Sequence, residues 1–276
     1  MAYPVIDAPY GLKPINLIGG QVFAGSTREY AIANGYNTNI FYGDFVALVR
    51  GNLERISVTS GAAGTLAGIF LGCSYTNPVT KQKQFAQYWP AGTAAGDAVA
   101  IVCDDPDTVF KAVICSSGTT VASGARAMIG QNLECLNNTG STATGNSKNA
   151  LAAPTDTPVT TSSLPIRVLG LVPETAVSLG TATYTSISTA TVTCSALPFA
   201  LPVGTDVGSL DSSGNYIPSG SFVDTAASAG ATTFVLNQAP SAAFAASATL
   251  VFTQYPELLV KLNFGQHEYY AGTATA

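Results

Sequence analysis

Short apolar runs alternate with turn residues along most of the chain, a pattern typical of β-strands. The 27 glycines and 15 prolines are spread so widely that few windows of a dozen residues escape both, which leaves little room for helices. Runs of Val, Ile, Leu, Phe and Thr bounded by Gly, Pro, Asp or Ser predict strands. The expected strands are 44–49, 98–102, 109–114, 166–172, 191–194, 232–236, 249–253 and 258–262.

This spacing predicts an all-β fold with a β-barrel or sandwich as its core domain. One segment, 124–136, leaves a helix open as an alternative. Its apolar residues fall at mixed spacing and fit neither period well. They are Ala127, Ile129, Leu133 and Leu136.

The first part of the chain, 1–40, differs from the rest because aromatic residues and prolines precede any convincing strand. We expect an extended N-terminal arm and a first strand here, with the arm lying on a partner surface. The residues that suggest it are Tyr3, Pro4, Pro9, Tyr10 and Pro14.

The segment 178–253 contains three aspartates and no Lys, Arg or Glu. It reads as a small inserted β-rich module that is exposed at the surface. The core β domain would then comprise 41–177 and 254–276. Inside the module, 191–197 and 232–239 are similar strand-then-proline units, which suggests two equivalent hairpins.

A further stretch, 137–163, is rich in Asn, Thr, Ser, Gly and Ala and poor in large apolar residues. We expect it to form a long loop or a loosely ordered strand pair. It is too polar for us to expect core residues in it.

Charged residues make up only 10% of the chain, and the net charge is −5, whereas soluble domains average about 25% charged residues. With no basic field to attract phosphates, nucleic-acid binding is not expected. No apolar run approaches the roughly 18 residues of a membrane span, so no membrane partner is expected either. The segment that starts at Met1 does not resemble a secretory leader, and we expect synthesis in a host cytoplasm.

The chemistry-bearing residues give little support for catalysis. Histidine occurs once, at His267, so a nucleophile–histidine unit would depend on this one position near the C-terminus. We interpret His267 as a hydrogen-bonded or interface residue, with a base or pH switch as the alternative. We expect no enzyme activity, no cofactor and no metal site.

The five cysteines form no Cys-x-x-Cys motif, and each lies in or beside an apolar run, so we expect buried thiols rather than disulfides. They are Cys73, Cys103, Cys115, Cys135 and Cys194.

Two other motifs have a functional and a structural interpretation. The acidic run 104–107, Asp-Asp-Pro-Asp, could bind Ca²⁺, but it lacks the EF-hand spacing and is a good turn sequence. The basic and aromatic run 81–89 ends in Tyr88 and Trp89, which could stack on a base or sugar. A protein contact or an aromatic cluster at the edge of the core is the favoured interpretation.

Motifs in a fixed order along the chain resemble a family of tailed-bacteriophage capsid cement proteins, also called decoration or head-stabilising proteins. The similarity covers 8–175 and 256–272, and the departure is the insertion near 178–253. The motifs are Ala-Pro-Tyr-Gly-Leu-Lys-Pro-Ile at 8–15, Gly-Ser-Thr-Arg-Glu-Tyr at 25–30, Ile-Phe-Tyr-Gly-Asp-Phe-Val at 40–46, Gly-Ile-Phe-Leu-Gly-Cys-Ser-Tyr at 68–75, Gln-Tyr-Trp-Pro-Ala-Gly-Thr at 87–93, the acidic run 104–107 before Phe110, Ile-Gly-Gln-Asn at 129–132, Leu-Gly-Leu-Val at 169–172, and Leu-Val-Lys-Leu-Asn at 259–263 with Gln266-His267.

The resemblance implies a structural virion protein on the outer capsid surface that bridges neighbouring major capsid protein subunits and stabilises the head. Its partners would be the major capsid protein and other copies of itself, as a homotrimer or, as the second choice, a dimer. The alternative is a head-fibre, tail or host-surface adhesin whose inserted module binds a cell-surface glycan. The expected interface residues are Tyr3, Pro4, Pro9, Tyr10, Leu12, Pro14, Tyr88, Trp89, His267, Tyr269 and Tyr270.

Overall fold

In the computed structural model of the chain, almost all regular secondary structure is β-strand. The structure describes residues 6–58, 66–124, 126–153, 164–210, 217, 220–239, 247–263, 265 and 267–269. Over this part of the chain there are twenty strands and two short 3-10 helices. The prediction of an all-β protein is confirmed.

Internal contacts divide the chain into two compact units. We call the first the insertion unit; it consists of the described residues within Ser123–Ile129 and within Gly170–Glu257. The second, the main unit, consists of Ile6–Ala122, Gly130–Leu169 and the chain from Leu258 onward.

The module expected at 178–253 lies within the insertion unit, which extends further at both ends. β14 (Val177–Ser188) and β19 (Thr249–Gln254) carry the chain into and out of this unit, and they are paired from Val177 and Gln254 onward. The backbone N–H of Gly124 also donates to the carbonyl oxygen of Tyr255 at 2.7 Å. A distant segment therefore joins the unit through backbone pairing, which composition does not reveal.

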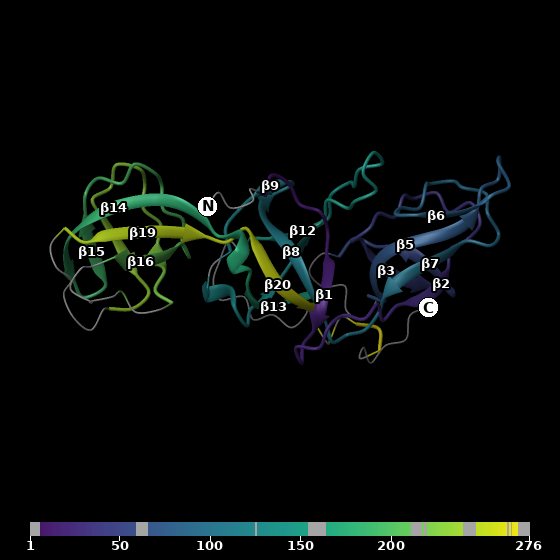
Figure 1. Ribbon diagram of the computed structural model, residues 1–276, viewed down its shortest axis with the longest axis horizontal. Coiled ribbons are helices and arrows are strands. Elements are labelled where there is room, and N and C mark those ends of the chain that lie inside the picture. Colours follow the sequence, from purple (N-terminus) through teal and green to yellow (C-terminus); the bar gives the residue numbers. More distant parts are fainter. Residues whose placement is uncertain are drawn as a thin grey trace. The chain divides into compact units, whose positions relative to one another are not determined.

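The main unit is built on two sheets (Figure 1). In the first, the long strand β8 pairs with β1, β9, β12 and β20. In the second, the order is β2-β7-β5-β3-β4, with β6 also paired to β5. The strands of the first sheet are β1 (Lys13–Leu17), β8 (Thr108–Ser117), β9 (Thr120–Val121), β10 (Asn132–Leu133), β11 (Cys135–Leu136), β12 (Ala150–Ala152), β13 (Ile166–Leu171) and β20 (Glu257–Leu262); those of the second are β2 (Arg28–Ala31), β3 (Phe45–Val49), β4 (Asn52–Arg55), β5 (Gly68–Thr76), β6 (Lys83–Ala86) and β7 (Val99–Cys103).

Aromatic side chains dominate the core of the main unit. Trp89, Phe41, Phe45, Phe70 and Phe110 are among its largest fully buried side chains. Each removes roughly 150–250 Å² of mostly apolar surface from water, and such burial is the main driving force for folding.

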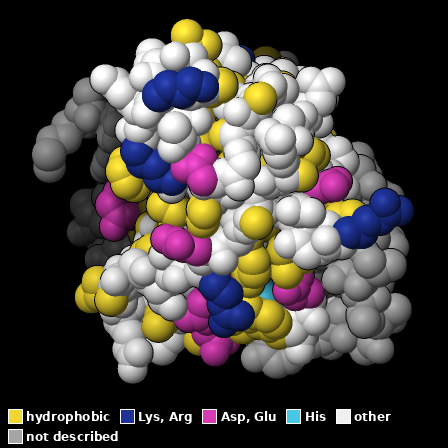
Figure 2. Space-filling view, turned by 90° about the vertical axis from the view of Figure 1, so that its right-hand side faces the viewer, with side chains coloured by type: hydrophobic (Ala, Val, Ile, Leu, Met, Phe, Trp, Pro, Cys, Tyr) yellow, Lys and Arg dark blue, Asp and Glu magenta, His cyan; other side chains and the backbone are white. Residues whose placement is uncertain are grey.

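The surface of the protein carries little charge. On the side drawn in Figure 2, Lys, Arg, Asp and Glu side chains stand singly or in small groups among uncharged and hydrophobic ones. This arrangement agrees with the low count of 27 charged residues in 276.

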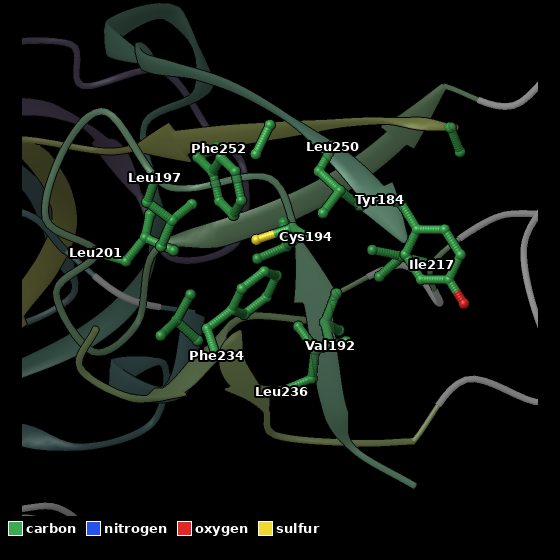
Figure 3. Packing of buried hydrophobic residues seen from close by; sticks show 14 residues of the cluster. Tyr184, Val192, Cys194, Leu197, Leu201, Ile217, Phe234, Leu236, Leu250 and Phe252 are labelled. Carbon is green, nitrogen blue, oxygen red and sulfur yellow. The ribbon is translucent and has the colours of Figure 1, made fainter. Parts of the chain in front are cut away.

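The insertion unit has one six-stranded sheet and its own core. In the core, the ring of Phe252 packs edge-on against those of Phe199 and Phe234, with centroid distances of 5.6 and 5.5 Å. The side chain of Cys194 lies beside Phe252 and Phe234 (Figure 3). The sheet order is β16 (Asp206–Leu210), β19, β14, β15 (Thr191–Cys194), β18 (Thr233–Leu236) and β17 (Val223–Thr225).

All eight strands expected from the sequence are present. The helix alternative for 124–136 is wrong, since only the 3-10 turn η1 (Arg126–Met128) is helical before β10 and β11. Gly130 follows that turn with a φ of +85°, which an α-helix does not allow.

The polar stretch 137–163 is more ordered than expected. It contributes β12, and Ser147 and Asn149 are almost fully buried. The expectation that it holds no core residues is wrong, because a buried carboxylate, described below, satisfies their polar groups. Residues 154–163 lie outside the described part of the chain.

Candidate functional site

Part of the N-terminal segment 1–40, which was expected to lie on a partner chain, forms a strand of the main unit. β1, the strand over 13–17, pairs antiparallel with β8 of the same chain. Just before it, the N–H of Gly11 donates to the carbonyl oxygen of Asn149 at 3.1 Å, and Leu12 is fully buried. A free extended arm is therefore wrong for these residues, because their backbone groups pair within their own chain. The first strand expected in 1–40 is present, and contact of this segment with a partner stays a prediction.

The other N-terminal candidates vary in exposure. Pro9 is buried, and Tyr10 and Pro14 are partly buried. Tyr3 and Pro4 lie outside the described residues. The exposed apolar side chains of the N-terminal segment are instead aliphatic residues, described next.

Three large aliphatic side chains are exposed on β1 and the turn after it. Ile15 is 39% exposed, Ile18 52% and Val22 80%. We call these three residues the β1 patch. Sequence reasoning missed them, although an aliphatic residue directly before Gly19-Gly20 is a usable signal of an apolar turn.

Trp89 lies in the core and Tyr88 beside it. The Trp89 side chain is fully buried, and its Nε1–H donates to the carbonyl oxygen of Tyr36 at 3.1 Å. Its ring packs edge-on against Tyr75, with centroids 5.4 Å apart, and Tyr88 stacks on Phe41 at 5.6 Å. The interpretation as an aromatic cluster at the edge of the core is confirmed for Tyr88 and Trp89, and Trp89 is not a surface residue.

The acidic run 104–107 and the C-terminal segment meet in one cluster. The Oδ2 atom of Asp104 accepts a hydrogen bond from the hydroxyl of Tyr30 at 3.0 Å and another from the hydroxyl of Tyr269 at 2.5 Å. The same oxygen lies 3.1 Å from Nε of Arg28. We call Arg28, Tyr30, Asp104, His267 and Tyr269 the C-terminal cluster.

His267 anchors this cluster from the C-terminal side. Its side chain is fully buried, and it makes a hydrogen bond with the backbone of Asp104. Its Nδ1 accepts from the N–H of Tyr269 at 3.3 Å, and the next residue, Glu268, donates its N–H to Leu66 O. The interpretation of His267 as a hydrogen-bonded residue is confirmed; the interface interpretation does not suit a side chain with no exposed surface.

The cluster is arranged for holding the chain together rather than for proton transfer. Burial is the main cause that raises the pKa of Tyr30 and of Tyr269, so both phenols stay protonated and donate. The Asp104 carboxylate raises the pKa of Arg28, which stays charged. Tyr269 is 44% exposed, and Tyr270 lies outside the described residues.

The remainder of the acidic run forms the expected turn. The N–H of Asp107 donates to Oδ1 of Asp105 at 2.9 Å, and that of Thr108 to the Asp105 carbonyl oxygen at 3.1 Å. Within the described ranges, no group of three His, Cys, Asp or Glu residues is placed to hold a metal ion.

Asp44, which is fully buried, organises a second polar cluster. Its carboxylate accepts hydrogen bonds from the N–H of Phe41 at 2.9 Å, Nε of Arg55 at 2.8 Å, and the side chains of Ser147 and Asn149 at 2.5 and 3.0 Å. Burial raises the pKa of Asp44, and its donors, Arg55 foremost, oppose that shift. This network ties the polar stretch to the Ile-Phe-Tyr-Gly-Asp motif and has a structural role.

The cysteines offer no reactive thiolate. All five are buried and free, as expected. Burial raises the pKa of Cys73 to about 12 and those of Cys103 and Cys115 to about 11. At neutral pH these thiols are protonated and poorly nucleophilic.

The hairpin of β5 and β6 carries the most exposed apolar residues described. Val79, near its tip, is 86% exposed, and Phe85, on β6, is 82% exposed. Asp97 holds the hairpin: it accepts from the N–H and hydroxyl of Thr76 at 3.0 and 2.7 Å and lies 3.0 Å from Nζ of Lys83. Phe85 lies within the run 81–89. The sequence does not predict which side of the strand its side chain occupies, because its neighbours before it are Lys and Gln.

Comparison with known proteins finds no matching family model, no matching curated protein and no matching solved structure. Among the described residues, no helix is both long and apolar enough to cross a membrane.

Proposed function

We propose that this chain is a capsid cement protein of a tailed bacteriophage: a structural virion protein that binds the outer surface of the head and links neighbouring major capsid protein subunits. The proposal starts from the ordered motifs, which lie almost entirely in the main unit. Two of these motifs, 40–46 and 104–107, supply Asp44 and Asp104, the buried carboxylates of the two polar clusters. Both motifs therefore have a structural role in the fold.

The observation that carries the proposal furthest is the exposed apolar surface of the main unit. Of the eight large hydrophobic side chains exposed among the described residues, six belong to it. They are Ile15, Ile18, Val22, Val79, Phe85 and Tyr269.

Apolar side chains on a surface with few charges suit contact with another protein, because little charge has to be desolvated on binding. Many such contacts, repeated around a closed shell, gain strength from avidity even when each is weak. A cement protein therefore needs neither a catalytic group nor a strongly charged face.

The test is the heat resistance of heads. Expanded heads made without this chain are mixed with the purified protein and heated while DNA release or shell disruption is followed. The proposal predicts that saturating protein raises the disruption temperature. Heads that neither bind the protein nor gain stability contradict it.

A second candidate, an adhesin, is favoured by one observation: the insertion unit has a hydrophobic core of its own. A module with its own core can carry a separate binding activity. In that case the insertion unit would bind a glycan on the host surface.

A further inference from the structure

Four neighbouring strands of the main unit present one face that is not part of its core. In the order β2, β7, β5, β6, alternate residues point to opposite sides. Phe70, Ala100 and Val102 point to one side and belong to the hydrophobic core. We call the opposite side the open face; its residues are Glu29, Ala31, Gly72, Ser74, Phe85, Val99 and Ile101.

The strand register lines these residues up in rows across the sheet. Ala31 is opposite Val99, Val99 is opposite Ser74, and Ser74 is opposite Phe85. The row therefore runs small, large, small, large from β2 to β6. Residues directly opposite each other on paired strands lie side by side on the same face.

The adjacent row repeats part of this pattern. Glu29 is opposite Ile101, and Ile101 is opposite Gly72. A large apolar residue on β7 again lies next to a position on β5 with no side chain. The centre of the open face is therefore uncharged, and the size of its side chains alternates from one strand to the next.

The open face is accessible to a partner. Phe85 is 82% exposed, Ala31 is exposed, and Val99 and Ile101 are partly exposed. Aromatic residues are enriched at protein interfaces, so an exposed Phe on this face favours contact with another protein.

We propose that the open face binds the open face of a second copy of this chain, with the two-fold axis parallel to the strands and between β7 and β5. This operation reverses the order of the row. Phe85 then covers Ala31 of the second copy, and Val99 covers Ser74. In this row each large side chain therefore lies over a small one.

Charge plays no part in this pairing. Glu29 lies on β2 in the row of Ile101, whereas Lys83 lies on β6 in the row of Thr76 and is already 3.0 Å from Oδ2 of Asp97. The two-fold axis leaves each row at its place along the strands, so Glu29 of one copy stays about 13 Å along the strands from Lys83 of the other. The fit comes from the alternation of large and small residues, which is self-complementary and requires two-fold symmetry.

The size of the face sets the strength of the pairing. Strands about 4.8 Å apart and rows about 6.7 Å apart give a footprint of roughly 400 Å² for each copy. Such an interface is below the usual size for a stable dimer. The dimer is therefore weak in solution, and it does not depend on the capsid.

The test is sedimentation equilibrium of the full chain from about 10 µM to about 1 mM, the range for a small interface. We expect a reversible monomer–dimer equilibrium. Phe85→Asp raises the dissociation constant at least about tenfold, because it removes the largest apolar side chain of the contact and places a charge in it. Val79→Asp, on the same hairpin and equally exposed but outside the open face, leaves the constant unchanged.

A size swap tests the register. Ala31→Phe and Phe85→Ala each weaken the dimer, the first by a clash and the second by a cavity, and the double variant Ala31→Phe/Phe85→Ala recovers most of the affinity. Circular dichroism checks that every variant folds. A chain that stays monomeric throughout the range, a dimer that Phe85→Asp leaves unchanged, or a double variant weaker than both single ones overturns the proposal.

Discussion

Gly11, in the first sequence motif, occupies a position that excludes a side chain. Its φ is +79°, and a Cβ atom there would lie 2.6 Å from the carbonyl oxygen of Gly43 and 2.7 Å from Cβ of Ser147. Both the backbone conformation and the space therefore require glycine. This is a physical reason for the Ala-Pro-Tyr-Gly motif that involves no partner.

We predict that Gly11→Ala lowers the free energy of unfolding by about 3 kcal/mol or more, since strain and overlap add. Gly35→Ala is the matched control, because Gly35 has a similar φ of +72° with nothing within 4 Å of the added Cβ. It should cost only about 1 kcal/mol. Urea unfolding followed by fluorescence measures the free energy of unfolding of both variants. Equal decreases in the two variants would contradict the steric overlap described for a Cβ atom at position 11.

His267 is the only histidine, so its titration can be followed directly. Burial lowers its pKa, and this outweighs the opposing effects of the Asp104 backbone and the charges of Asp104 and Asp105. The unfolded chain takes up a proton near pH 6.5 before the folded chain does. His267 therefore favours the folded state fully above pH 6.5 and loses this contribution as the pH falls below 6.5 towards the folded pKa.

The measurement is the pH dependence of the single imidazole signal in the NMR spectrum. We predict a midpoint below 6.5, with loosening of the C-terminal cluster as the ring becomes charged. In His267→Gln, the corresponding decrease in stability between pH 7.5 and 5 should be smaller. A midpoint at or above 6.5 contradicts the buried environment described for this residue.

At the scale of elements, the β5–β6 hairpin depends on Asp97, which bonds Thr76 and Lys83, the strand pair next to the turn. Hydrogen bonds from the Thr76 N–H, the Thr76 hydroxyl and the Lys83 ammonium, in that order, hold the pKa of Asp97 well below its usual range. A lowered pKa means that the ionised form favours the folded hairpin. This contribution is present above about pH 4 and is lost as the pH falls through the folded pKa.

We predict that backbone amides of the hairpin exchange with solvent faster below about pH 4, after correction for the intrinsic rate. Asp97→Asn should show faster exchange already at neutral pH and little further change in acid. Amides of β14, in the other unit, serve as the internal control. Identical protection of the hairpin in both proteins at pH 7 would contradict the role of Asp97.

The sequence predicted some elements well and missed others for identifiable reasons. Strands such as β15 and β18 combine β-branched residues with clear turns on both sides, and both were predicted. The longest strand, β14, was missed because its Val-Ser-Leu-Gly-Thr-Ala-Thr-Tyr run alternates small and polar residues and has only a few buried side chains.

The candidate surface was less predictable than the fold. Trp89 and His267 were placed at an interface because aromatic and titratable residues are common there, but both are buried by residues far away in sequence. Conversely, which side of β6 Phe85 occupies depends on its register with β5, which is a tertiary property.

At the scale of the whole molecule, the two paired strands at the entry to the insertion unit allow it to be removed. Val177 and Gln254 are directly opposite each other on β14 and β19, so their Cα atoms are about 5 Å apart. We predict that replacing 178–253 by a short Gly-Ser linker leaves a main unit that unfolds cooperatively.

The same deletion distinguishes the two proposed functions. A cement protein keeps binding heads, whereas an adhesin loses binding to host cells.

The most direct test of the capsid proposal is a binding isotherm on purified expanded heads that lack this chain. We predict saturation at a fixed number of copies per head. Ile18→Asp/Val22→Asp in the β1 patch should weaken binding at least about tenfold, while Val203→Asp, an exposed position in the insertion unit, binds like the unchanged protein. Absence of saturable binding by the unchanged chain would contradict the proposed function.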